Sequence, residues 1–306
     1  MRWCTYSTDA GLIRTGLVEG NTVLGLDATV RLVDLIATPH GLEDAARAVR
    51  RDPAEAVPLS QVRLHAPVPE PPSVRDFMAF EEHVVTASAA IGLTVDPLWY
   101  AQPVFYFTNP AALRGAYDPV AISPGSAAFD YELEVAAVIG REGSDLTPED
   151  AVEHIAGYTL FCDWSARDLQ GEEMKLNLGP AKGKDSASSC GPWMLTPDEL
   201  PAAAAMTAEV NGRPYSAGNL DALYWTFGEM IAYASRGTRV VPGDLIGSGT
   251  VGTGCILELS RVHGADAYPY LVPGDRVRLE VAGLGAIDAP IVPGAAVRPL
   301  RKKESA

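Results

Sequence analysis

Two glutamates lie two residues apart in the segment AFDYELEVAAVIG, which covers residues 128–140. Alternate side chains of a β-strand point to the same face, so Glu132 and Glu134 would stand about 7 Å apart on one side of a strand. Most side chains around them are apolar or aromatic on both faces, which predicts a buried strand. Two buried carboxylates would each cost several kcal/mol without compensation. They therefore either face water at a strand end or share a cation.

A third carboxylate, Asp163, ends the apolar segment GYTLFCD and opens the polar turn DWSARDLQ. Three carboxylates offer only oxygen donors, which suit Mg2+, Mn2+ or Ca2+ better than a soft metal. Arg167 and Gln170 follow in the same turn, where an arginine fork and an amide could hold a carboxylate or carbonyl group of a substrate. A capped helix with an internal ion pair would use the same residues, and the pattern leaves both interpretations open.

Two glycine-rich segments could approach a ligand. The loop LGPAKGKDSASSCGPW carries Lys182 and Lys184. A lysine close to the carboxylates could act as an electrophile or a proton donor, although most loop lysines are simply solvated. The segment GSGTVG, residues 247–252, matches the glycine pattern of dinucleotide-binding loops, which need a helix directly after them. The following residues 255–262, CILELSRV, alternate like a strand, so we expect the glycines to form a tight turn near a ligand instead.

The composition argues against several classes of protein. The 306 residues include 39 Asp and Glu against 24 Lys and Arg, a formal net charge of -15, which disfavours a surface for nucleic acid or anionic membrane. No segment approaches the roughly 18 apolar residues of a membrane-spanning helix, and the first residues lack the apolar stretch of a secretion signal, so we expect a cytoplasmic protein. The four cysteines form no CxxC pair, so their spacing predicts neither disulfides nor a zinc site.

The elements that must position these residues predict an α+β fold. Residues 1–70 form a small unit, and the proline-rich stretch APVPEPPS marks its boundary with a larger unit over 71–306. Helices are predicted over residues 41–52, 79–92, 147–158 and 225–237. Short apolar segments punctuated by Gly and Pro predict strands over residues 132–140, 157–163, 207–215, 239–249, 255–262 and 275–285. Regular βαβ alternation is missing, which indicates a β-rich mixed sheet or roll with helices outside.

The order of four motifs resembles one known family. The ELE strand, the DWSARDLQ turn, the lysine- and glycine-rich loop ending in GPW and the late segment GSGTVGTGCILEL are together similar to the fumarylacetoacetate hydrolase superfamily, over roughly residues 62–300. The resemblance implies the β-rich roll of that family's C-terminal domain, with helices outside. It covers the small N-terminal α+β unit only in its placement.

The resemblance also implies a metal site and a catalytic pair. It assigns Mg2+, or alternatively Mn2+ or Ca2+, to four carboxylates: Asp76, Glu132, Glu134 and Asp163. It assigns a histidine base to His83 and its orienting carboxylate to Glu258. The family's lysine falls on Lys184 rather than Lys182, and Ser188 stands near the metal where a threonine is usual.

The implied activity is metal-dependent hydrolysis of a C–C bond in a β-diketo acid of the fumarylacetoacetate or acylpyruvate type. His83 would activate water with Glu258 as its partner. The developing oxyanion and the carbon leaving group would be served by Lys184, Arg167 and Gln170. Substrate contacts are implied at Met78, Arg167, Gln170 and Thr250.

Two alternatives to the hydrolase are weighed on the same residues. A decarboxylase, hydratase or isomerase of the superfamily would use the same metal to stabilise an enolate, and the retained pair of His83 and Glu258 favours the hydrolase over it. A non-catalytic binding protein or scaffold on the same fold would predict a lost ligand, yet all four carboxylates are present.

The resemblance further implies a small anionic oxo-acid substrate, a homodimer and a role in aromatic catabolism, while the acidic composition argues against a nucleic-acid or membrane partner. Two departures concern the substrate pocket. Hydrolases that act on fumarylacetoacetate usually carry a tyrosine where this chain has Met78, and a second tyrosine near residues 174–175 is missing. We therefore expect the family's reaction class with an altered substrate.

Overall fold

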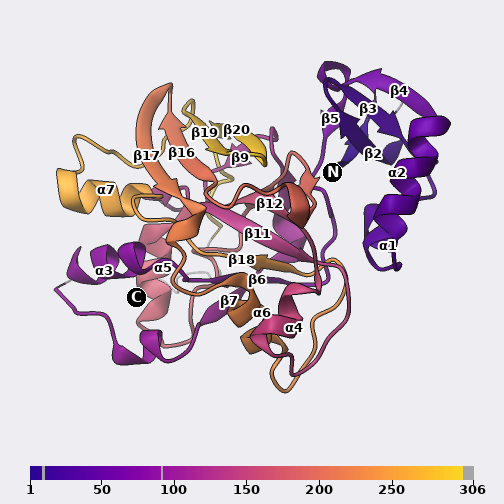
Figure 1. The fold of residues 1–306 in the computed structure, drawn as a ribbon. Coiled ribbons are helices and arrows are strands. Elements are labelled where there is room, and N and C mark those ends of the chain that lie inside the picture. Colours follow the sequence, from indigo (N-terminus) through magenta and orange to yellow (C-terminus); the bar gives the residue numbers. More distant parts are fainter. Residues whose placement is uncertain (9–10, 91, 299–306) are drawn as a thin grey trace.

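The structure is a computed structural model that describes residues 1–8, 11–90 and 92–298. The chain begins with a small group of elements that lies at one end of the molecule (Figure 1). Their bounds are β1 (Arg2–Ser7), β2 (Ile13–Glu19), β3 (Thr22–Gly25), α1 (Leu32–Ile36), α2 (Gly41–Arg51), β4 (Glu55–Pro58) and β5 (Arg63–Leu64). The two helices pack their apolar faces on Trp3 and Leu17 of the strands.

The remaining strands and α-helices form the larger part of the molecule. In chain order they are β6 (Val74–Phe77), α3 (Glu81–Ala90), β7 (Phe105–Thr108), β8 (Leu113–Gly115), β9 (Val120–Ala121), β10 (Phe129–Asp130), β11 (Leu133–Ile139), α4 (Pro148–Val152), β12 (Ile155–Asp163), β13 (Ser165–Ala166), α5 (Arg167–Met174), β14 (Ser188–Cys190), β15 (Met194–Leu195), β16 (Ala205–Val210), β17 (Arg213–Asn219), α6 (Phe227–Ser235), β18 (Leu245–Gly247), α7 (Ile256–His263), β19 (Arg276–Val281) and β20 (Gly285–Val292). Short 3-10 turns cover η1 (Leu59–Gln61), η2 (Pro97–Tyr100), η3 (Pro110–Ala112), η4 (Pro197–Glu199) and η5 (Leu220–Ala222).

One mixed sheet runs through both parts of the chain. Its strand order is β4-β3-β2-β1-β15-β12-β11-β18-β6-β7, and a second sheet has the order β17-β16-β19-β20-β9. Most pairs are antiparallel, whereas β18 with β6, β14 with β8 and β20 with β9 are parallel. The expected α+β class with a β-rich mixed sheet is thus confirmed. The division near residue 70 stays a prediction, and the sheet crosses it where Trp3 of β1 pairs with Met194 of β15.

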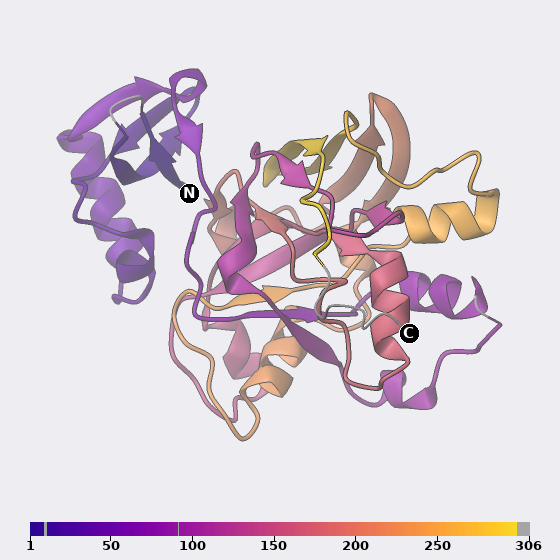
Figure 2. The same ribbon diagram turned by 180° about the vertical axis from the view of Figure 1, so that it is seen from behind.

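Strand β11 lies at the centre of the large sheet, between β12 and β18. All of its residues are buried, as the apolar pattern on both faces predicted. Helices α3 and α7 lie side by side at the end of the molecule opposite the N-terminal elements, with α5 close to them (Figures 1 and 2). Polar side chains from the sheet strands and polar side chains from these helices can therefore meet in one region.

The strand predicted over residues 255–262 is wrong, because these residues form helix α7. Ile256 and Leu259, three residues apart, are buried on one face of the helix. Asp130 accepts hydrogen bonds from the backbone amides of Ile256 (2.7 Å) and Leu257 (3.0 Å), which have no partner within the helix itself. A short apolar run cannot distinguish a helical from a strand period. Here the hydrogen bonds to Asp130, which lies far away in the sequence, stabilise the helix.

Three other predicted elements need correction. The helix over 147–158 stops at Val152, because the chain from Ile155 onward pairs with β11 as strand β12. The strand over 207–215 is a hairpin of β16 and β17, whose turn residues Asn211 and Gly212 both have positive φ. Of the strand over 239–249 only β18 forms. The expected helices over 41–52, 79–92 and 225–237 are present as α2, α3 and α6.

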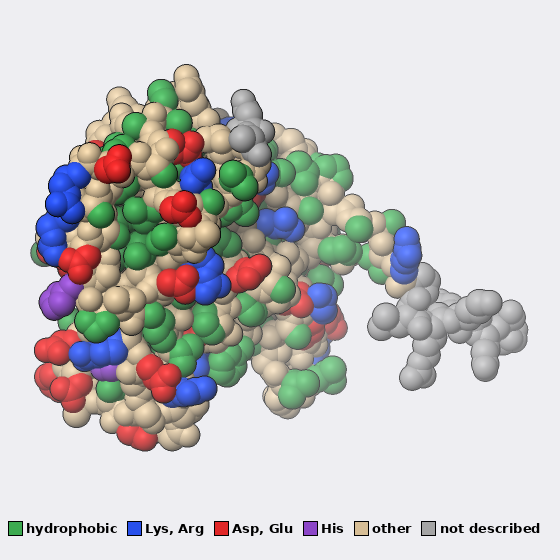
Figure 3. Space-filling model, turned by 90° about the vertical axis from the view of Figure 1, so that its right-hand side faces the viewer, with side chains coloured by type: hydrophobic (Ala, Val, Ile, Leu, Met, Phe, Trp, Pro, Cys, Tyr) green, Lys and Arg blue, Asp and Glu red, His purple; other side chains and the backbone are tan. Residues whose placement is uncertain are grey.

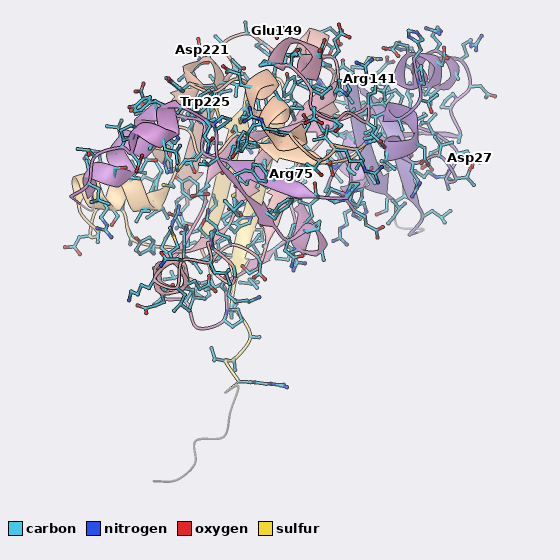
Figure 4. All side chains as sticks on the ribbon, turned by 90° about the horizontal axis from the view of Figure 1, so that it is seen from below. Asp27, Arg75, Arg141, Glu149, Asp221 and Trp225 are labelled. Carbon is cyan, nitrogen blue, oxygen red and sulfur yellow. The ribbon has the colours of Figure 1, made fainter. Side chains whose placement is uncertain are left out.

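Charged side chains occur both on the surface and in the interior of the molecule. Lys and Arg side chains are interspersed with Asp and Glu on the face drawn in Figure 3. Figure 4 places Arg75 near the middle of the molecule and Asp27 at the outer edge of the N-terminal elements. Arg75 is buried and paired with Asp244 at 3.1 Å. A helix long and apolar enough to cross a membrane does not occur in residues 1–8, 11–90 and 92–298.

Candidate active site

Strand pairing brings the predicted metal ligands together. Gly247 of β18 pairs with Asp76 of β6 on one side and with Ala136 of β11 on the other. The two glutamates of the ELE segment lie at the start of β11, so they meet Asp76 across Gly247. Single oxygens of Asp76, Glu132 and Glu134 all lie within 4.8 Å of one another. Two distant parts of the chain thus contribute carboxylates to one buried cluster, and β18 lies between them.

Asp163, at the end of β12, reaches the same cluster through a tyrosine that the sequence did not single out. The Tyr106 hydroxyl lies 2.9 Å from Oδ2 of Asp76 and also hydrogen-bonds to Asp163. Tyr106 lies on β7, which pairs with β6 directly opposite Asp76. A tyrosine within the apolar segment FYFT is typical of a strand and gives no functional signal in the sequence. Only the pairing of β7 with β6 indicates that Tyr106 belongs to the site.

Three carboxylates present one oxygen each that receives no hydrogen bond from any described residue. These atoms are Oδ1 of Asp76, Oε1 of Glu134 and Oδ1 of Asp163, and all three are buried. Their second oxygens are held by Tyr106 or, for Glu134, by the Gly249 amide at 3.0 Å. Buried anionic oxygens without donors are costly unless a cation binds them. This donor set fits a hard divalent cation.

The backbone leaves room for this cluster at one glycine. A Cβ atom on Gly247 would overlap with Oδ1 of Asp76 and lie 3.3 Å from Oε2 of Glu134. The absence of a side chain at this position therefore allows the carboxylates from β6 and β11 to approach each other. Gly247 itself lies in strand β18 and not in the tight turn expected for the GSGTVG glycines, and the groups that approach it are the two protein carboxylates.

The electrostatics of the cluster are uneven. Burial, and after it the charge of Asp163, raise the pKa of Asp76 to about 7. Burial and the neighbouring Asp76 also raise the pKa of Glu134 well above its usual range. Burial opposes the charged form of Glu132 as well, but Lys184 and Arg167 outweigh it and lower its pKa to about 2. Too little positive charge therefore lies near Asp76 and Glu134 to stabilise their ionised forms, and a divalent cation would supply it.

The two predicted cations of the site both bind Glu132. Arg167 contacts Oε1 of Glu132 at 2.8 Å, and Lys184 contacts Oε2 of Glu132 and, at 2.8 Å, Oδ2 of Asp163. Lys184 is buried, whereas the Lys182 side chain is 71% exposed and pairs with Asp185. The structure thus places Lys184 in the cluster and Lys182 outside it.

The expected histidine and glutamate pair forms between two helices. His83 of α3 hydrogen-bonds through Nδ1 to Oε1 of Glu258 on α7, and both side chains are buried. The Thr253 amide donates to the other glutamate oxygen at 2.9 Å, and the Cys255 thiol lies 3.6 Å from Oε1. This arrangement fixes the carboxylate on Nδ1 and leaves Nε2 of the imidazole as the nitrogen that can accept a proton.

A second residue that the sequence analysis did not single out is Asp130. It is buried and accepts a hydrogen bond from Nε of Arg167 at 2.8 Å, besides those from the first amides of α7. These bonds already use the N-terminus of α7. The first two amides of the helix that follows the GSGTVG glycines are therefore already bonded to a protein carboxylate instead of a pyrophosphate, and β18 is not part of a βαβ unit. The dinucleotide reading fails for this reason and not because a strand follows.

Most of the predicted residues line one cavity of about 680 Å³. They are Asp76, Met78, His83, Glu132, Arg167, Gln170, Lys184, Thr250 and Glu258. Glu134 and Asp163 lie behind them in the carboxylate cluster and are not part of the cavity wall. Gln170 accepts a hydrogen bond from Arg167 at 3.3 Å. Ser188 is buried with its strand paired to Asp163, and its hydroxyl does not line the cavity. Met174, where a tyrosine is missing, lies at the cavity wall.

Comparisons with known proteins agree with this site. A family model described as the C-terminal part of fumarylacetoacetate (FAA) hydrolase matches residues 73–292. The chain is 26% identical over 296 residues to a mitochondrial oxaloacetate tautomerase of Xenopus laevis. The matched region covers 94% of this chain and 88% of that protein.

Two solved structures share the fold over 96% of this chain. Maleylpyruvate hydrolase from Sphingobium sp. SYK-6, in complex with manganese(II) ion and pyruvate, is 25% identical with a TM-score of 0.73 and is covered over 100% of its length. Fumarylacetoacetate hydrolase from Exiguobacterium antarcticum is 27% identical with a TM-score of 0.73 and is covered over 99%. Because the family model spans every candidate site residue from Asp76 to Glu258, this chain belongs to the fumarylacetoacetate hydrolase family.

Proposed function

We propose that this protein hydrolyses a C–C bond in a β-diketo acid of the acylpyruvate or fumarylacetoacetate type. The observation that carries the proposal is the buried pair of His83 and Glu258 beside the carboxylate cluster, within one cavity. A histidine held by a carboxylate is suited to remove a proton from water. Chemistry that only stabilises an enolate has no need for such a water-activating pair.

A divalent cation bound by Asp76, Glu132, Glu134 and Asp163 would polarise the adjoining oxygens of a 2-oxo acid. Mn2+ and Mg2+ are the ions that we assign to this oxygen-only site. The Sphingobium maleylpyruvate hydrolase, which carries manganese(II) and pyruvate, supports that assignment. Asp76, Glu134 and Asp163 would contribute the oxygens that receive no protein hydrogen bond.

The chain's own residues divide the remaining work. His83 accepts a proton from water, whose oxygen forms a bond to the acyl carbonyl carbon. Lys184 and Arg167 stabilise the negative charge on the carbonyl oxygen. The C–C bond then breaks, giving a carboxylic acid and the enolate of the 2-oxo acid. The proton held by His83 passes to the enolate carbon, which completes the second product and restores the neutral imidazole. Burial opposes protonation of Lys184, but Asp163 and Glu132 raise its pKa above the usual range, so it acts as a fixed cation.

Replacement of the histidine tests the proposal. H83A should lower kcat/KM for an acylpyruvate by roughly 10²–10⁴-fold, because general base catalysis is lost. Its Mn2+ affinity, measured by calorimetry, should stay near that of the wild type. H154N is the matched control, since His154 is also buried but its Nδ1 contacts the Arg141 carbonyl and its side chain does not line the cavity. Wild-type turnover by H83A would remove the base from the mechanism.

The oxaloacetate tautomerase of Xenopus laevis points to a second candidate, a reaction that moves a proton without breaking a C–C bond. The same assay separates the two candidates because products are identified by mass spectrometry. Hydrolysis gives two acid fragments, whereas tautomerisation leaves the mass of the substrate unchanged. Conversion of 2-oxo acids without fragments from any β-diketo acid would favour the tautomerase.

A further inference from the structure

A second group of metal-binding atoms lies directly beside the carboxylate cluster. One imidazole nitrogen of His83, Sγ of Cys255 and one carboxylate oxygen of Glu258 all lie within 4.8 Å of one another, and all three residues are buried. Oε1 of Glu258 contacts both Nδ1 of His83 and Sγ of Cys255. The two groups are linked by the backbone, because Glu132 and Cys255 face each other in an isolated β-bridge. One nitrogen, one sulfur and one oxygen form a donor set that differs in kind from the oxygen-only cluster.

The spacing of these atoms matches a tetrahedral ion. Zinc lies about 2.3 Å from sulfur and about 2.0 Å from a carboxylate oxygen, so two such ligands at a tetrahedral angle stand about 3.5 Å apart. Sγ of Cys255 and Oε1 of Glu258 are 3.6 Å apart. The imidazole of His83 needs only to give up its hydrogen bond to Glu258 and move outward to admit an ion. Both His83 and Glu258 line the cavity, which provides an entry path.

Charge and softness favour zinc at this position. A dication between one thiolate and one carboxylate leaves no net charge in a buried site, whereas Mg2+ and Mn2+ prefer the oxygen ligands nearby. Burial, followed by the Asp130 carboxylate, raises the pKa of the Cys255 thiol well above its usual range. A bound zinc ion removes that obstacle, because metals deprotonate the thiols that coordinate them. The thiol proton is released to solvent.

We propose that His83, Cys255 and Glu258 form a zinc site that inhibits the enzyme by capturing its catalytic pair. Zinc on Nδ1 of His83 fixes the remaining proton of the neutral imidazole on Nε2, so the imidazole cannot accept a proton from water. It also separates Glu258 from His83. Mg2+ or Mn2+ would thus support activity while Zn2+ stops it. The inhibitory effect rests on the proposed role of His83, but the binding site does not.

Spectroscopy with Co2+, a stand-in for zinc, tests the site without any assay of activity. The full-length protein, saturated with Mg2+, is titrated with Co2+ while thiolate-to-metal charge-transfer absorption is followed in the near ultraviolet. The wild type and C190S should show this absorption and C255S should not. Cys190 is the matched control because it is buried and hydrogen-bonds to Thr159, away from the pair. Absorption that is absent from the wild type or persists in C255S would overturn the site. C255A gives the same comparison if C255S is unstable.

Inhibition is tested on the Mn2+-loaded enzyme, with each variant compared with its own zinc-free rate. C255S should need at least about tenfold more Zn2+ for half inhibition than the wild type or C190S, because a ligand is lost. Equal sensitivity of C255S and the wild type would show that zinc acts at the carboxylate cluster, which contradicts the proposal. If no substrate is turned over, the proposed function fails while the Co2+ absorption still decides the zinc site.

Discussion

At the scale of single residues, the proposed metal site depends on carboxylates with two unlike oxygens. Asp76, Glu134 and Asp163 each have one oxygen fixed by a protein donor and one that receives no hydrogen bond from the described residues. The fixed oxygen orients the side chain before a cation arrives. Glu132 differs, because Arg167 and Lys184 pair with both of its oxygens. The three carboxylates should therefore determine metal affinity more strongly than Glu132 does.

Removing one of these oxygens should weaken metal binding. E134Q keeps the shape of the side chain but replaces the charge, so Mn2+ affinity measured by calorimetry should fall at least about tenfold. E142Q is the control, since Glu142 is exposed and pairs with Arg239 at 3.4 Å. Unchanged Mn2+ affinity in E134Q would take Glu134 out of the metal site.

Individual residues show where sequence reasoning stops. Glu132, Glu134 and Asp163 stand out because carboxylates rarely occur in apolar strands. Lys184 could be preferred over Lys182 only through a family resemblance, since both lie in one polar loop. Tyr106 gives no signal, because a tyrosine in a strand is ordinary and its role depends on which strand lies beside it.

At the scale of secondary-structure elements, Asp130 joins the two halves of the site. It binds Nε of Arg167, which opens α5, and the first amides of α7, which carries Glu258. One buried carboxylate therefore connects the proposed water-activating pair with Arg167, the group proposed to stabilise the oxyanion. This connection also explains why α7 is predicted as a strand. Asp130, which accepts hydrogen bonds from the first amides of the helix, lies 126 positions before Ile256 in the chain.

Loss of the Asp130 hydrogen bonds should lower kcat by more than any loss of folding stability would explain. D130N should reduce kcat roughly 10–100-fold, with Mn2+ affinity little changed, because Arg167 and α7 lose a shared partner. D244N is the matched control: Asp244 is equally buried, pairs with Arg75 and accepts the Val241 amide. D130N should also be non-additive with R167Q in a double-mutant cycle. Equal effects of D130N and D244N on kcat would mean that Asp130 is only structural.

The crossing of β6, β18 and β11 gives a second test at this scale. G247A adds a methyl group where Oδ1 of Asp76 lies, so the strands must separate or the carboxylate must turn away. We expect Mn2+ affinity to fall by at least about tenfold. G171A is the control, because a Cβ there meets nothing within 4 Å. Normal Mn2+ binding by G247A would show that the cluster tolerates the added methyl group.

At the scale of the whole molecule, a strongly acidic chain is proposed to bind an anionic substrate. One bound divalent cation changes the formal charge only from -15 to -13, that is -15 + 2. Its effect is local, since it joins Lys184 and Arg167 in a buried site where screening is weak. Net charge alone, which served to argue against nucleic acid, therefore gives no information on the sign of the potential inside the cavity.

The overall architecture shows a similar division between what the chain does and does not reveal. The α+β class and the buried central strand follow from short apolar segments without βαβ alternation. The path of the sheet does not, because β1 at the N-terminus pairs with β15, whose Met194 and Leu195 lie almost two hundred residues away. Such pairings depend on the packing of Trp3 and Met194 in one core, which no local pattern records.

The most direct test of the central claim is the incorporation of oxygen from water into the products. The Mn2+-loaded enzyme is incubated with an acylpyruvate in H2¹⁸O, and the acid fragments are analysed by mass spectrometry, with an enzyme-free sample to correct for carbonyl exchange. Water activated by His83 and Glu258 predicts one ¹⁸O atom in the newly formed carboxylate, and no such fragment with H83A. Turnover that leaves the C–C bond intact, or fragments without ¹⁸O in the new carboxylate, would contradict the account.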